Sequence, residues 1–174
     1  MVEGTTAKGR GAASGTGLPG GRGGYALVIK LQEPLGLPVG ALGAVTLPSG
    51  YCLYFGSAMS GLAARVARHL RRRKRLHWHI DYLTSVALPL EVWWAECGHR
   101  TECHWAAAAL LLPGASAPAP GFGASDCRCG SHLVHVGRRP SAADLRALLG
   151  PRWSGVIQVL PTGAGCDHAR GAGG

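Results

Sequence analysis

Two short runs of aromatic and aliphatic residues constrain the fold of this chain more than any other feature. The runs Tyr25–Leu31 and Tyr51–Phe55 have the length and composition of buried strands, and Gly56 ends the second. We expect these two strands to pair antiparallel. The residues between them are rich in proline and glycine, which predicts an irregular connection. Further apolar runs predict strands at residues 90–95, 133–136 and 156–160.

Between the predicted strands the apolar pattern becomes helical. Leu62, Val66 and Leu70 recur every four residues and define the buried face of a helix over residues 60–72. Three more helices are predicted at residues 77–83, 102–112 and 142–149, with Thr101 as the N-cap of the second. The fold class is therefore α/β (α+β), with a small central, mostly antiparallel sheet flanked by helices.

The length of 174 residues predicts one domain. We place it at residues 23–160, between flexible tails at 1–22 and 161–174 that contain few large apolar side chains. The G-x-G-x-x-G match at residues 15–20 follows no strand and is rejected as a dinucleotide site. The N-terminus lacks the apolar segment of a secretory signal, and no apolar run reaches the length of about 18 residues typical of a membrane helix. We expect a cytoplasmic protein.

The positive charge of the chain is concentrated in one run. The chain has 18 Lys and Arg against 9 Asp and Glu, a formal charge of +9. Seven of these cations, and no acid, lie in one short segment: Arg65, Arg68, Arg71, Arg72, Arg73, Lys74 and Arg75. A local basic patch indicates a polyanion as partner, and arginine favours forked contacts with phosphate. An ordinary solvated helix face is the alternative.

The six cysteines indicate reduced thiols in a chain without a signal peptide. They are Cys52, Cys97, Cys103, Cys127, Cys129 and Cys166. None forms the C-x-x-C pair of common zinc modules. Buried free thiols are therefore the simpler interpretation, and a zinc site completed by His99, His104 or His132 is the alternative.

Several catalytic classes are excluded by their missing motifs. The chain has no G-x-S-x-G nucleophile motif and no P-loop. Its nine acids do not cluster, which argues against a two-metal nuclease. Chemistry with one Mg²⁺ ion remains open, because one carboxylate can hold Mg²⁺ whose other ligands are water and phosphate.

Five elements in order resemble the GIY-YIG nuclease superfamily. Gly23-Gly24-Tyr25 opens the first predicted strand and Tyr54-Phe55-Gly56 closes the second, like the paired G-I-Y and Y-I-G elements. Arg65 and His69 have the spacing of the family's helical Arg and His or Tyr, and Glu102 has the place of its metal-binding glutamate. The segments 51–57, 65–69, 77–83 and 125–133 are similar to the uncharacterised Uri-type branch.

The resemblance implies a metal-dependent endonuclease that hydrolyses phosphodiester bonds, with DNA as the expected substrate. Tyr25 or Tyr54 would act as the base, and Arg65 would neutralise charge on the phosphoryl group. His69 would orient water or transfer a proton, and Glu102 would anchor Mg²⁺ or Mn²⁺. The basic run would hold the nucleic-acid backbone through Arg68, Arg71, Arg72, Arg73, Lys74 and Arg75.

The sequence departs from the family pattern in three places. Tyr25 and Tyr54 are 29 residues apart, Gly24 replaces the usual Ile, and the family's late Asn has no clear counterpart, although Ser125, Asp126 or His132 lies near its place. A nucleic-acid-binding module that has lost catalysis is therefore one alternative function. A structural zinc protein that uses the Cys/His clusters is the other. His77, His79 and Asp81 are either ligands or part of a hydrogen-bonded core.

Overall fold

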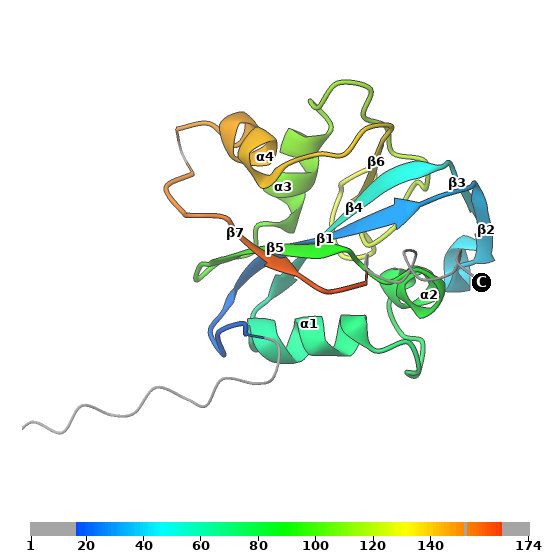
Figure 1. Ribbon diagram of the computed structural model, residues 1–174, viewed down its shortest axis with the longest axis horizontal. Coiled ribbons are helices and arrows are strands. Elements are labelled where there is room, and N and C mark those ends of the chain that lie inside the picture. Colours follow the sequence, from blue (N-terminus) through cyan, green and yellow to red (C-terminus); the bar gives the residue numbers. More distant parts are fainter. Residues whose placement is uncertain (1–16, 152, 165–174) are drawn as a thin grey trace, which may run out of the picture.

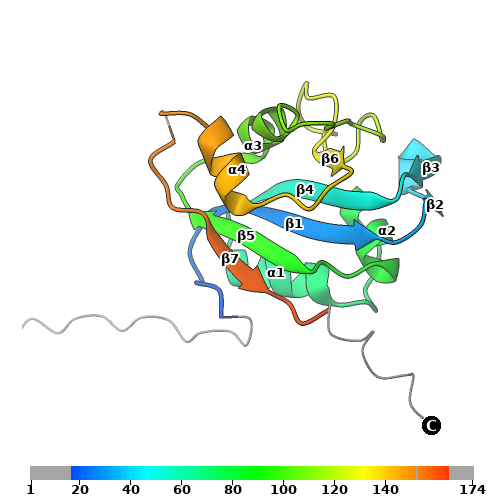
Figure 2. The same ribbon diagram turned by 45° about the horizontal axis from the view of Figure 1, so that its top comes forward.

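The computed structural model describes residues 17–151 and 153–164 as a layered α+β domain (Figures 1 and 2). The elements lie in the predicted order, with one additional hairpin. The strands are β1 (Gly23–Leu31), β2 (Leu35–Pro38), β3 (Ala44–Leu47), β4 (Gly50–Ala58), β5 (Glu91–Glu96), β6 (Leu133–Val136) and β7 (Gln158–Pro161). The helices are α1 (Leu62–Leu70), α2 (His79–Val86), α3 (Glu102–Ala109) and α4 (Ala142–Leu148), with a short 3-10 turn, η1 (Gly40–Leu42).

The main sheet has five strands in the order β6-β4-β1-β5-β7, and every neighbouring pair is antiparallel. The predicted fold class is thus confirmed. The predicted pairing of the first two long strands is also confirmed, with Tyr25 opposite Gly56 and Tyr54 opposite Leu27. This register brings the two tyrosine-containing motifs together at the sheet centre.

Both faces of the sheet are covered, because successive side chains of a strand point to opposite faces. Tyr25, Leu27 and Ile29 of β1 pack in the core beneath α1 and α2, whereas Ala26 and Val28 pack in the core beneath α3 and α4. Figure 1 shows the two helix pairs on opposite sides of the sheet. A strand buried on both faces reads as one continuous apolar run, which is the pattern that identified β1.

The connection predicted as irregular contains the hairpin of β2 and β3. Leu37, Val45 and Leu47 turn inward and are buried, and within the two strands they alternate with exposed residues. Val39, directly after β2, is buried as well. This alternation is short and is interrupted by prolines and glycines, so composition alone favours a loop. The hairpin extends the core beyond the end of β1 and β4.

The segment before β1 is packed against the domain where it is described. Residues 17–22 were predicted to belong to a flexible tail, but Leu18 is 1% exposed and lies in the core. The carbonyls of Pro19 and Gly21 accept hydrogen bonds from the amides of Ala63 and Leu62 at the start of α1. Residues 1–16 of that predicted tail, and 165–174 of the second, lie outside the described residues. Within the described part of the chain, no helix is long and apolar enough to cross a membrane.

Candidate active site

A cavity of about 430 Å³ opens where β1, β4, α1 and α3 meet. Its wall includes four of the five residues that the resemblance marks as catalytic: Tyr25, Tyr54, Arg65 and Glu102. The fifth, His69, lies directly behind Tyr25, and its Nε2 atom is 2.8 Å from the Tyr25 hydroxyl. The fold thus gathers all five candidates, which come from four different elements.

Gly56 makes room for the Tyr25 ring. The two residues face each other across β1 and β4, and a Cβ atom added to Gly56 would lie 2.4 Å from the Tyr25 hydroxyl oxygen. Any larger residue would therefore displace the ring from its contact with His69. Gly56 of the second motif is therefore required for the packing of Tyr25 of the first motif.

The absence of a side chain at Gly24 is also required by packing. A Cβ atom added to Gly24 would lie 1.9 Å from the hydroxyl oxygen of Thr101, the N-cap residue of α3. The departure from the family's usual Ile therefore coincides with a close approach of α3 to β1. This approach brings Glu102 to the cavity.

The two tyrosines are held mainly in their neutral form by burial. Burial raises the pKa of Tyr25 well above its usual value, and the neighbouring Tyr54 raises it further, while Arg65 lowers it. Burial likewise raises the pKa of Tyr54, against the lowering effect of Arg65. The Arg65 guanidinium also lies over the Trp78 ring, 4.4 Å from its centroid. Arg65 is thus the cation that faces both phenols.

His69 is a buried, uncharged imidazole at neutral pH. Burial lowers its pKa below the ordinary value, although Asp81 acts in the opposite direction. Its Nδ1 atom lies 3.7 Å from Asp81 Oδ1, while its Nε2 atom faces Tyr25. A proton on Nδ1, facing the carboxylate, leaves Nε2 free to accept the hydrogen bond of the Tyr25 hydroxyl.

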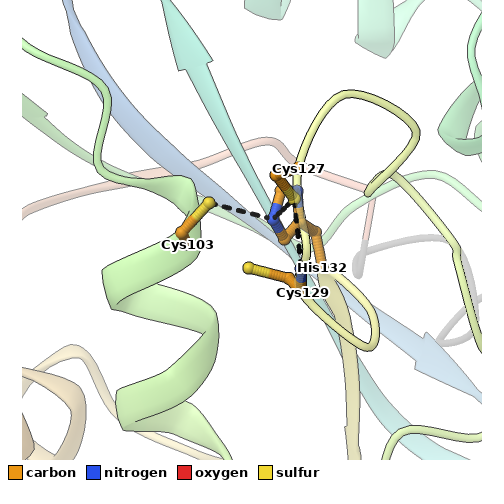
Figure 3. Close-up of side chains that lie close together, drawn as sticks. All are labelled: Cys103, Cys127, Cys129 and His132. Carbon is orange, nitrogen blue, oxygen red and sulfur yellow. Dashed lines mark hydrogen bonds between the residues drawn. The ribbon is translucent and has the colours of Figure 1, made fainter.

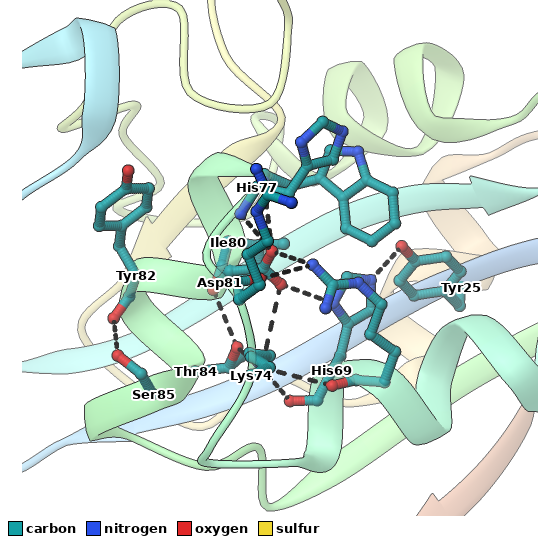
Figure 4. Close-up of polar contacts among 12 residues, drawn as sticks. Tyr25, His69, Lys74, His77, Ile80, Asp81, Tyr82, Thr84 and Ser85 are labelled. Carbon is teal, nitrogen blue, oxygen red and sulfur yellow. Dashed lines mark hydrogen bonds and ion pairs between the residues drawn. The ribbon is translucent and has the colours of Figure 1, made fainter.

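Asp81 joins α2 to α1 beneath the site (Figure 4). Its Oδ2 atom accepts hydrogen bonds from the Arg68 guanidinium at 2.6 Å and from the amides of His77 and Trp78, each at 3.0 Å. Burial alone would raise the pKa of Asp81, but the neighbouring His69, the hydrogen bonds from the amides of Trp78 and His77 and the charge of Arg68 lower it to about 2. Asp81 was predicted to be either a metal ligand or part of a hydrogen-bonded core, and its contacts are those of a hydrogen-bonded core.

The basic run divides into internal and external members. The Lys74 side chain is 3% exposed, and its ammonium donates to the His69 carbonyl at 2.8 Å and to Thr84 Oγ1 at 2.6 Å. Burial lowers the pKa of Lys74 to about 8, against the effect of Asp81. Lys74 is therefore occupied inside the fold, and the half-buried Arg68 is bound to Asp81, whereas both were predicted to lie on a phosphate-binding surface. The exposed members are Arg71, Arg72, Arg73 and Arg75.

Glu102 is oriented by a serine that sequence reasoning did not select. The Ser57 hydroxyl accepts a hydrogen bond from the Thr101 amide at 2.9 Å and donates one to Glu102 Oε2. Thr101 occupies the predicted N-cap position, but its own side chain makes no capping bond, so Ser57 of β4 does this from across the fold. Arg100 Nη1 lies 3.7 Å from Glu102 Oε1 and 2.8 Å from Asp126 Oδ2. The only sequence signal for Ser57 is its place directly after the Tyr54-Phe55-Gly56 motif.

A second cluster, drawn in Figure 3, borders the cavity through His132, which also lines the cavity wall. Cys103 of α3 faces Cys127, Cys129 and His132 of the segment that leads into β6, and one ligand atom from each lies within 4.8 Å of all the others. The predicted candidates Cys97, His99 and His104 instead line a separate cavity with Trp153. The structure therefore selects His132 among the three histidines considered.

The model of a family described as Domain of unknown function DUF123 matches residues 24–150, which includes the cavity and the cysteine–histidine cluster. No curated protein and no solved structure matches the chain.

Proposed function

We propose that this chain, which belongs to the DUF123 family, is a metal-dependent endonuclease of the Uri-type GIY-YIG kind. The proposal is drawn from the cavity, because the family description names no function. One observation carries the proposal. The five residues that resemble this superfamily's catalytic set are far apart in the sequence, yet Tyr25, Tyr54, Arg65 and Glu102 share one cavity wall and His69 contacts Tyr25.

The donor atoms of the cavity suit a divalent cation. Glu102 is 8% exposed and reaches the cavity from the first turn of α3, and the Asp126 carboxylate lies on the same wall. Carboxylate oxygens are the ligands that Mg²⁺ and Mn²⁺ prefer, and Mg²⁺ takes its remaining ligands from water and phosphate. Glu102 would hold the ion, which when bound would polarise the scissile phosphate.

Tyr25 is the better placed of the two candidate bases. Its hydroxyl donates to His69 Nε2 at 2.8 Å, and His69 is neutral and oriented by Asp81. As the Tyr25 oxygen takes a proton from the attacking water, His69 can take the phenolic proton, so no free phenolate has to form first. Burial raises the pKa of Tyr25 and so disfavours its phenolate, but this transfer of two protons does not require the phenolate.

Arg65 supplies fixed positive charge at the reacting phosphate. It lies on the cavity wall, and stacking on Trp78 limits the positions that its guanidinium can adopt. A preoriented cation stabilises the charge that develops on phosphoryl oxygens without reorganisation.

The exposed arginines extend this positive field beyond the cavity. Two residues that line the cavity, His77 and Trp78, follow the exposed arginines Arg71, Arg72, Arg73 and Arg75 closely in the sequence. A nucleic-acid backbone that follows these side chains would lead a phosphate toward Arg65. Contacts of this kind set affinity and position rather than sequence preference.

A nuclease assay tests the proposal. The purified chain is incubated with branched, flapped, single-stranded and supercoiled DNA, and with RNA, in Mg²⁺, in Mn²⁺ and in EDTA. We expect cleavage with either ion and none in EDTA. Binding to these substrates without cleavage under any condition would instead establish the catalytically inactive binding module.

A further inference from the structure

We propose that Cys103, Cys127, Cys129 and His132 bind one structural Zn²⁺ ion that is separate from the cavity's catalytic metal. Three thiols and one imidazole are the donor set of a Cys₃His zinc site. The thiols are free in the structure. This site goes beyond the proposed nuclease function and does not depend on it.

The spacing of the donor atoms fits one tetrahedral ion. A Zn²⁺ ion with bonds of about 2.3 Å to sulfur and about 2.1 Å to nitrogen places neighbouring ligand atoms about 3.6–3.8 Å apart. His132 Nε2 lies 3.5 Å from Cys103 Sγ and 3.4 Å from Cys127 Sγ, and the four donor atoms lie within 4.8 Å of one another. Small rotations of the side chains would bring all four into bonding distance.

The surroundings of the donors also suit a metal-bound state. The Cys129 amide points at Cys127 Sγ at 3.5 Å, and an N–H donor of this kind stabilises a thiolate. His132 presents Nε2 to the sulfurs, and its backbone amide donates a hydrogen bond to the Phe122 carbonyl at 2.7 Å, which fixes the position of its backbone.

The donor set determines both the metal and its role. Thiolates select zinc over magnesium, so this site does not compete with Glu102 for the same ion. Four protein ligands complete a tetrahedral shell and leave no position for water or substrate, which is the mark of a structural site rather than a catalytic one.

The ion would fasten two parts of the cavity wall to each other. Cys103 follows Glu102 in the first turn of α3, whereas the other three ligands lie on the segment 121–132. Two hydrogen bonds join the ends of this segment, from Gly121 N to Gly130 O and from His132 N to Phe122 O, each 2.7 Å long. Figure 3 shows Cys103 reaching from the helix toward the ligands of that segment. Zinc at this point would link the start of α3 to the loop that carries Asp126.

Metal analysis tests this site without any measurement of activity. The chain is purified without chelators, its affinity tag is removed, and its metal content is measured by mass spectrometry. We expect about one zinc ion per chain. We also expect Cys103→Ser and Cys127→Ser to lose most of it, while Cys97→Ser, whose thiol contacts the His99 carbonyl outside the cluster, keeps it.

Cobalt substitution keeps the test decisive if the cysteine variants do not fold. Wild-type protein loaded with Co²⁺ is expected to show the visible absorption of a tetrahedral ion with a thiolate charge-transfer band. Protein that contains less than about a tenth of a zinc ion per chain and takes up no Co²⁺ would overturn the proposal. A disulfide among these cysteines in the native protein, iron with acid-labile sulfide, or equal zinc loss in Cys97→Ser would overturn it as well.

Discussion

Glu102 and Cys103 are neighbours in the first turn of α3, but they face two sites of opposite character. Glu102 brings one carboxylate to an open cavity that also contains tyrosines and an arginine. Cys103 brings one sulfur to a compact group of four donors. The first arrangement leaves space for water and phosphate beside an oxygen ligand, whereas the second leaves none.

Two neighbouring residues of α3 thus serve sites with different requirements. A hydrolytic site needs vacant space and fixed charge around the reacting atoms, while a structural metal needs a complete ligand shell. Loss of charge in the cavity should therefore leave the zinc content unchanged, although the two sites are adjacent in the chain.

The largest expected effect comes from removing the fixed charge of the cavity. Arg65→Ala should lower the cleavage rate by about 10²–10³, the typical loss when one oriented charge-stabilising group is removed. Its zinc content should stay at the wild-type value, and its affinity for DNA should change little because the exposed arginines remain. Rate measurements under single-turnover conditions, with the exposed Arg146→Ala as control, check this. Cleavage within a factor of two of wild type would remove Arg65 from the mechanism.

The next effect concerns the support beneath the cavity. Asp81→Asn leaves the buried Lys74 without its nearby carboxylate, and losing one partner of a buried ion pair costs about 3 kcal/mol. We expect the free energy of unfolding, measured by urea denaturation, to fall by roughly that amount. The exposed Glu33→Gln serves as the control. If Asp81→Asn is as stable as Glu33→Gln, the network of Figure 4 does not hold α2 to α1.

A smaller effect is expected on the salt dependence of DNA binding when the exposed arginines of the basic run are changed. Changing Arg71, Arg72, Arg73 and Arg75 to Gln together should flatten the dependence of log affinity on log salt by up to about 3–4 units, because each phosphate contact contributes about −0.9 to the slope for duplex DNA. Fluorescence anisotropy across a salt series measures this slope. Arg138→Gln with Arg146→Gln, both exposed elsewhere, should leave it nearly unchanged. An equal slope in the quadruple variant would identify the run as a solvated surface.

The smallest effect is the dependence of stability on acid pH. The pKa of Asp81 is about 2 in the folded chain, below its ordinary value, so the unfolded chain binds more protons as the pH falls from about 4 to about 2, and stability is lost in that window. The lowered pKa of His69 acts in the same direction below about pH 6.5. Urea denaturation over this range should show a shallower loss below pH 4 in Asp81→Asn. An identical slope in both proteins would show that other carboxyl groups dominate.

Sequence reasoning predicted the elements whose signal is local. Strands β1 and β4 were found because each is a continuous apolar run, as expected of strands buried on both faces. The hairpin of β2 and β3 was missed because prolines and glycines obscure its short alternation of inward and outward residues. The segment around Leu18 was misjudged for a related reason, since one large apolar residue among glycines is enough to join a core when its backbone bonds to α1.

The candidate sites were predictable only where spacing follows a known pattern. The cavity residues were assembled from the resemblance, and the fold brings them together. Lys74 was assigned to a surface because a charge run does not reveal that an acid of the following helix, here Asp81, lies beside it. The full ligand set of Cys103 and His132 was left open because it forms by packing between α3 and a distant loop.

The most direct test of the nuclease proposal measures cleavage and zinc content in one pair of neighbouring variants. Glu102→Gln keeps the size of the side chain but removes the charge that would hold Mg²⁺. We predict that it binds DNA, retains about one zinc ion per chain and loses nearly all Mg²⁺-dependent cleavage. Cleavage by Glu102→Gln at the wild-type rate would contradict the account of the cavity.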